Sequence, residues 1–105
     1  MGRSSGEALA RIEEELVAER AAALRRIADR LAELIEELHD LGRASRAREA
    51  AGAPLVDQYR AVQRQARRYR WYLEVQREAI GLRRHEMLDE LYPIPAEPFS
   101  RPDLS

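Results

Sequence analysis

Residues 24–41 read LRRIADRLAELIEELHDL, and this stretch decides the fold class. Apart from Ile35, its large apolar residues fall at positions 24, 27, 31, 34, 38 and 41, with steps that alternate between three and four. This spacing places them on one face of a helix and is typical of a coiled-coil seam. No Pro or Gly interrupts residues 7–41, and Ser4 or Ser5 is suited to cap the start. The pattern therefore predicts a first helix over about residues 5–41.

A second run with the same periodicity follows after a break. Gly42 is suited to end the first helix, and Pro54 is suited to the first turn of another. The Ala- and Arg-rich composition of residues 43–51 leaves open whether they continue the first helix. The second seam predicts a helix over about residues 54–91, since Tyr92 precedes Pro93 and the residue before a Pro disfavours the α region. Its members are Leu55, Tyr59, Val62, Ala66, Tyr69, Leu73, Gln76, Ile80, Met87 and Leu91.

Two helices joined by a connection over residues 42–54 pack as antiparallel neighbours. The predicted fold class is therefore all-α, a long antiparallel two-helix hairpin that forms one domain over residues 1–95. Residues 96–105 contain two Pro residues, and we expect an extended or disordered tail there. A further interpretation is that residues 92–105 contact a protein partner, with Ile94 and Phe99 as apolar anchors.

The second helix is apolar on more than one side. At 100° per residue, Trp71, Val75 and Leu82 lie nearly opposite its seam, and Tyr72 lies between the two sides. A Gly inside a helix lowers its stability, so we interpret Gly81 as a point of close approach by another helix. These five residues predict an interface, and a symmetric dimer that forms a four-helix bundle is the simplest way to cover it. The alternative is a set of scattered surface residues.

The apolar stripe of the first helix is also wider than one neighbouring helix covers, since Leu9 and Ile12 extend it. Two charged residues, Glu13 and Arg20, fall within this stripe, and Gln76 falls within the second seam. Polar residues in a seam often fix the register or the oligomeric state of paired helices.

Charge is distributed unevenly along the 105 residues, although the formal net charge is only −1. Residues 1–41 carry six Arg and ten acidic residues, residues 42–84 carry eleven Arg and four acidic residues, and residues 85–105 carry one Arg and five acidic residues. This pattern favours pairing of the acidic first helix with the basic second helix, within the hairpin or across a dimer.

The basic segment also allows a second interpretation, nucleic-acid binding by guanidinium groups interleaved with aromatic rings. The sequence pI of about 6.1 argues against it, because nucleic-acid-binding domains are usually strongly basic. The candidate residues are Arg60, Arg64, Arg67, Arg68 and Arg70.

A metal-binding bundle is a third interpretation. Glu36 and His39 form a Glu-x-x-His pair, which resembles half of the ligand set of di-iron carboxylate bundles of the ferritin type. The second helix supplies no matching pair, and both side chains fall away from the core face. Glu78, His85 and Asp89 share one face of the predicted second helix and could bind a metal or form an ion-paired network.

The remaining features exclude several classes. The chain has no Cys, so it forms neither disulfides nor thiolate metal sites. It shows no apolar leader and no apolar run near the roughly 20 residues that span a bilayer, so we expect a cytoplasmic protein without membrane contact. No nucleophile–base pair and no phosphate-binding loop is visible, and we expect no cofactor and no enzymatic activity. The sequence favours a helical protein–protein interaction or scaffold module that self-associates.

Overall fold

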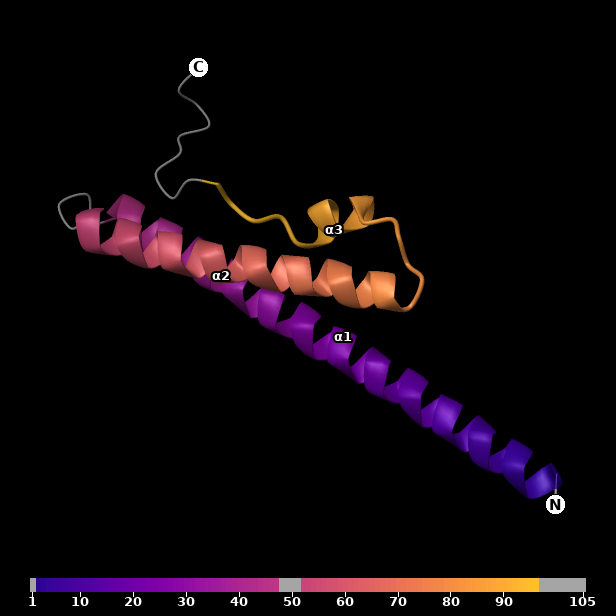
Figure 1. The fold of residues 1–105 in the computed structure, drawn as a ribbon. Coiled ribbons are helices and arrows are strands. Elements are labelled where there is room, and N and C mark those ends of the chain that lie inside the picture. Colours follow the sequence, from indigo (N-terminus) through magenta and orange to yellow (C-terminus); the bar gives the residue numbers. More distant parts are fainter. Residues whose placement is uncertain (1, 48–51, 97–105) are drawn as a thin grey trace.

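The computed structural model describes residues 2–47 and 52–96, with side chains described over 5–47 and 55–96, and these residues form an all-α fold. Helix α1 spans Gly2–Ala47, α2 spans Gly52–Ala79 and α3 spans Glu86–Leu91. Figure 1 shows α2 lying antiparallel along the C-terminal half of α1, while the N-terminal half of α1 projects away from the rest. The predicted all-α hairpin is confirmed; the structure contains one chain, so the predicted four-helix bundle stays a prediction.

The core lies between the C-terminal half of α1 and the part of α2 that runs from Tyr59 to Leu73. From α1 it takes Leu31, Leu34, Ile35 and Leu38, and from α2 it takes Tyr59, Val62, Ala66 and Leu73. These are seam residues of the three-four spacing, together with Ile35 beside the first seam. The predicted seams are therefore confirmed over this part of the hairpin, which apolar burial stabilises.

The first helix is longer than the sequence predicted. Gly42 lies inside α1 and is buried, so it does not end the helix. Together with Leu38 and the fully buried Ser45, it follows the four-three spacing of the seam, which places all three on the face turned towards α2. The expected helix end near residue 41 is therefore wrong, because Gly42 acts here as a small seam residue.

The second helix is shorter than predicted, and Gly81 is the cause. Gly81 has φ +90°, a left-handed conformation that residues with a side chain rarely adopt. The Gly81 amide donates to the Glu78 carbonyl at 3.0 Å, and the Leu82 amide donates to the Arg77 carbonyl at 2.9 Å. These two bonds are those of a Schellman motif, which closes a helix at its C-terminus. The expectation of one continuous helix to about residue 91 is therefore wrong.

Beyond Gly81 the chain turns back along α2. The short helix α3 buries Leu88 against the core, and Tyr92 and Ile94 pack at its edge. As a result, Ile80, Met87 and Leu91, which the sequence placed in the second seam, are exposed. Leu88, which the helical spacing did not select, takes the buried position instead.

We expect Gly81→Ala to lower the free energy of unfolding by about 1–2 kcal/mol, because an L residue is strained at this φ. Urea denaturation followed by circular dichroism measures the change. Gly6→Ala is the matched control: Gly6 is an exposed helical glycine with no neighbour within 4 Å of an added Cβ, so the same substitution should leave stability unchanged or raise it slightly. A Gly81→Ala variant as stable as the parent would contradict the Schellman assignment.

Candidate interaction surfaces

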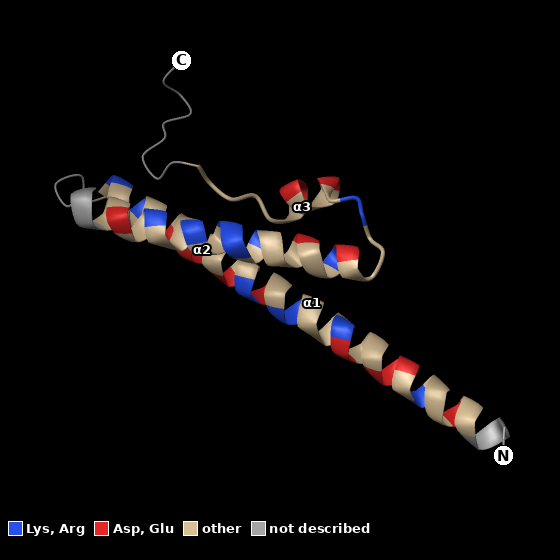
Figure 2. Cartoon of the chain, viewed as in Figure 1, with Lys and Arg blue, Asp and Glu red and all other residues tan. Residues whose placement is uncertain are grey.

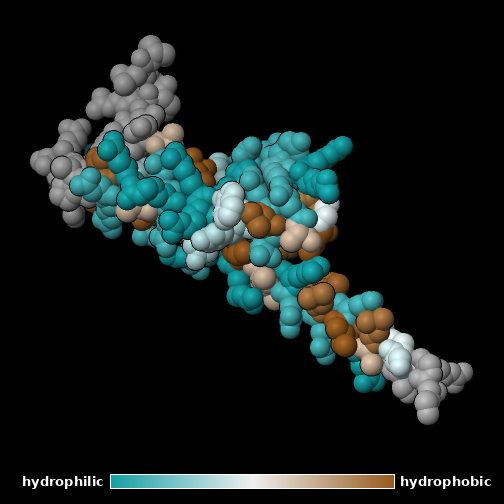
Figure 3. All heavy atoms as spheres, in the orientation of Figure 1, coloured by the Kyte–Doolittle hydropathy of each residue, from teal (hydrophilic) through white to brown (hydrophobic). Residues whose placement is uncertain are grey.

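The most exposed part of the described chain is the N-terminal half of α1. Every residue from 5 to 21 is exposed, and we call this segment the free arm. It carries four large apolar side chains, Leu9, Ile12, Leu16 and Val17, whose exposed fractions range from 44% to 67%. Figure 3 shows hydrophobic side chains gathered along the projecting end of α1. Single exposed apolar residues are ordinary, but four within nine residues of one helix form a patch that is typical of an interaction site.

A second exposed surface is the outer strip predicted on α2. Trp71 is 59% exposed, and its ring lies 5.6 Å from that of Tyr72, while Val75 is also exposed. Leu82 is exposed too, but it lies beyond the end of α2, so it does not continue the helical stripe. Gly81 has no atom within 4 Å of an added Cβ, so the predicted close helix approach is absent within the described chain, and its positive φ explains the glycine instead.

The basic face of α2 holds four of its five predicted members. Arg60, Arg64, Arg67 and Arg68 are exposed, and no ion pair joins any of them to another described residue. Figure 2 shows blue bands of basic residues on α2, whereas red bands of acidic residues are frequent along α1.

Arg70 does not belong to this face. Its side chain is only 17% exposed, and it donates to Asp89 at 2.9 Å and to Glu74 at 3.4 Å. The helical phase could have shown this, because Arg70 falls about 20° from the buried Tyr59 at 100° per residue.

The sequence pattern did not predict a polar strip on α2 that holds the returning segment, residues 82–96. Its donors, Gln63, Arg70 and Arg77, are seven residues apart and therefore lie on one face of the helix. Gln63 Nε2 donates to the carbonyl oxygens of Pro95 at 2.8 Å and Ala96 at 2.6 Å, and Tyr59 donates its hydroxyl to Pro95 at 3.3 Å. The seven-residue spacing of these donors in the sequence indicates that they share a face of α2. It identifies a binding strip only when the segment after Gly81 is known to turn back along this face.

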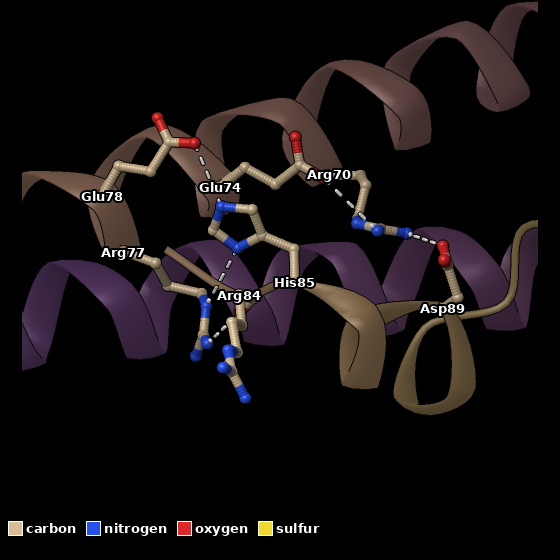
Figure 4. A network of polar contacts seen from close by, with 7 residues as sticks. All are labelled: Arg70, Glu74, Arg77, Glu78, Arg84, His85 and Asp89. Atoms are coloured by element: carbon tan, nitrogen blue, oxygen red, sulfur yellow. Dashed lines mark hydrogen bonds and ion pairs between the residues drawn. The ribbon is translucent and has the colours of Figure 1, made fainter. Parts of the chain in front are cut away.

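Arg77 binds the other end of the returning segment (Figure 4). Its guanidinium donates to the Arg84 carbonyl at 2.8 Å and from Nε to His85 Nδ1 at 3.4 Å. His85 Nε2 lies 3.1 Å from a carboxylate oxygen of Glu78. A neutral ring with its hydrogen on Nε2 satisfies both contacts, since Nδ1 then accepts and Nε2 donates. Figure 4 shows Asp89 turned towards Arg70 and away from this pair.

The candidate metal ligands are not assembled into one site. Glu78 and His85 meet, whereas Asp89 is paired with Arg70. Glu36 and His39 are exposed on α1. Over residues 2–47 and 52–96, no group of three or more His, Asp or Glu side chains is arranged to hold a metal ion.

The expected charge pairing between the two long helices is also not seen within the hairpin. The described ion pairs lie within α1 (Arg30–Glu33 and Asp40–Arg43), within α2 (Arg70–Glu74), and between α2 and the returning segment (Arg70–Asp89 and Glu78–His85). None of them joins α1 to α2. The hairpin core is mainly apolar, and none of the described ion pairs involves an acidic residue of the free arm.

Comparison with known proteins adds no further constraint: no family model, no curated protein sequence and no solved structure matches this chain. None of the described helices is long and apolar enough to cross a bilayer.

Two substitutions separate the contributions that hold α3 in place. Leu88→Ala removes a buried side chain and should lower the free energy of unfolding by about 2–3 kcal/mol. Asp89→Asn removes a carboxylate that is 75% exposed, so it should cost less than about 1 kcal/mol despite its ion pair with Arg70. Urea denaturation of both variants measures the difference, and equal costs would contradict the view that apolar burial anchors this segment.

Proposed function

We propose that this chain is a non-enzymatic helical interaction module that self-associates. The free arm carries the proposal, because its four large apolar side chains lie on a segment of α1 whose residues are all exposed in the described chain. Burying such a surface against a second molecule is favourable in proportion to the apolar area removed from water.

The shape of the molecule supports the same proposal. Its radius of gyration is 20.0 Å, against about 13 Å for a compact chain of this length. Its accessible surface is 8106 Å², whereas a compact monomer of 12.1 kDa exposes about 6,000 Å². The excess of about 2,000 Å² is larger than the roughly 800 Å² that each partner contributes to a standard interface.

Self-association is tested by light scattering coupled to size-exclusion chromatography. We expect a mass of twice the monomer for the parent chain at micromolar concentration. Ile12→Gln with Leu16→Gln should weaken association at least tenfold, because Gln keeps the helix propensity of Leu while it removes apolar area. Ala18→Gln is the matched control: Ala18 lies about 160° around the helix from Leu16, and this variant should associate as the parent does. A monomeric parent chain would end the proposal.

Nucleic-acid binding is the second candidate function. It is favoured by the four exposed Arg residues that have no described ion pair, with Trp71 next on the same side of α2. Binding of this kind weakens steeply with salt. The test is a titration of a labelled single-stranded RNA at 50 and 200 mM salt, with Arg64→Gln and Arg67→Gln as variants. Loss of affinity at the higher salt and in the variants would support this function, and absence of binding at the lower salt would remove it.

A further inference from the structure

Two charged side chains, Glu13 and Arg20, lie in the middle of the apolar face of the free arm. On a helix the neighbours of a residue are those three and four positions away. Every such neighbour of both residues is apolar. Around Glu13 these are Leu9, Ala10, Leu16 and Val17, and around Arg20 they are Leu16, Val17, Ala23 and Leu24.

Neither charge finds a partner along the described chain. No ion pair joins Glu13 or Arg20 to another described residue. They do not pair with each other either, and seven residues, about 10.5 Å along a helix axis, separate them. Both side chains are exposed to water in the single chain, and if this face is buried against another molecule, the described residues of the chain supply neither of them with a complementary charge.

From this arrangement we infer that two copies of the chain pair antiparallel through their free arms, about a two-fold axis close to Leu16. Glu13 lies three residues before Leu16 and Arg20 lies four residues after it. An antiparallel pair on this axis therefore brings Glu13 of each copy beside Arg20 of the other, and two ion pairs form from one symmetric contact. This inference rests on the proposed self-association and adds its geometry.

The same register also matches the apolar side chains. The Leu16 side chains of the two copies meet at the axis, and Leu9 of one copy lies opposite Ala23 of the other. Ala23 lies in a surface hollow between α1 and the end of α2, whose other lining residues are Leu16, Glu19, Arg20, Ala22, Arg26 and Gln76. The small side chains of Ala22 and Ala23 leave room there for a leucine. In this register the arm of one copy covers the hollow beside the end of α2 of the other copy.

A parallel pairing of the arms has the opposite electrostatics. Residues of the same number then face each other, so Glu13 lies against Glu13 and Arg20 against Arg20. Like charges in an apolar interface are unfavourable, because burial raises the cost of leaving them unpaired. The polar residues in this stripe therefore select direction and register, which is the role expected of polar residues in a helix seam.

Charge reversal tests the ion pairs. Glu13→Arg places two Arg side chains together at both symmetric contacts, and Arg20→Glu places two acids together. Each single variant should weaken dimerisation at least tenfold in sedimentation equilibrium at low salt. The double variant, with Glu13→Arg and Arg20→Glu, should return to within about threefold of the parent. A double variant that is as weak as the single variants would overturn the pairing. If the substitutions only damaged the helix, their effects would add, whereas two residues that form an ion pair regain it when both charges are reversed.

Single cysteines test the direction, since the natural chain contains none. In the inferred register Leu16→Cys lies at the axis and should form an intermolecular disulfide on mild oxidation. Leu9→Cys should not, since its two copies are about 21 Å apart along the axis and a disulfide needs Cα atoms within about 7 Å. A mixture of Leu9→Cys and Ala23→Cys chains should cross-link. Cross-linking of Leu9→Cys alone, as efficient as that of Leu16→Cys, would show a parallel pair and overturn the inference.

These outcomes are distinct from failure of the proposed function. A monomeric parent chain removes both proposals. A dimeric parent that is insensitive to charge reversal, or that cross-links at Leu9, keeps self-association and removes only the antiparallel register.

Discussion

The structure depends on the point at which α2 stops. Gly81 adopts a left-handed conformation, two Schellman bonds close the helix, and the chain turns back before α2 has covered more than about half of α1. α1 has 46 residues and α2 has 28. The difference in length is the free arm, so a local backbone requirement at one glycine leaves a long apolar helix face without a neighbour.

The hairpin and the free arm therefore differ in what stabilises them. The hairpin buries Leu31, Leu34 and Leu38 completely and closes its open side with Leu88 and the polar strip of α2. The arm has helical propensity from its many Ala, Leu and Glu residues, but most helical stability in proteins comes from tertiary packing of an apolar face, and no described residue packs over the face of the arm. In the proposed dimer a second copy would supply those contacts, and Glu13 and Arg20 would provide complementary charges only if the copies run in opposite directions.

The sequence predicted the fold well where one periodicity governs it. The three-four spacing from Leu24 to Leu38 and from Leu55 to Leu73 identified both long helices and their buried faces. It failed at two glycines, because a glycine is compatible both with a seam and with a stop. Gly42 is buried in a continuous helix, whereas Gly81 ends one, and only the surroundings of each distinguish the two roles. Because the stop at Gly81 was not predicted, the periodicity wrongly placed Ile80, Met87 and Leu91 in the buried seam. For the same reason it did not predict that Leu88 is buried. Among the candidate surfaces, Trp71 and Val75 are exposed, as an interface requires. The burial of Arg70 has two causes: its position on the helix, which follows from the sequence, and its contact with the returning segment, which no local pattern indicated.

Hydrogen exchange at a series of protein concentrations measures most directly whether a second copy stabilises the free arm. Amide protection reports the free energy of local opening, so a helix held by association is protected only where the associated form is populated. The account predicts that protection of residues 5–21 rises with concentration, while protection of residues 31–38 in the hairpin core stays constant. Strong protection of the arm at concentrations where the chain is monomeric would contradict it, and so would an arm that exchanges rapidly at every concentration.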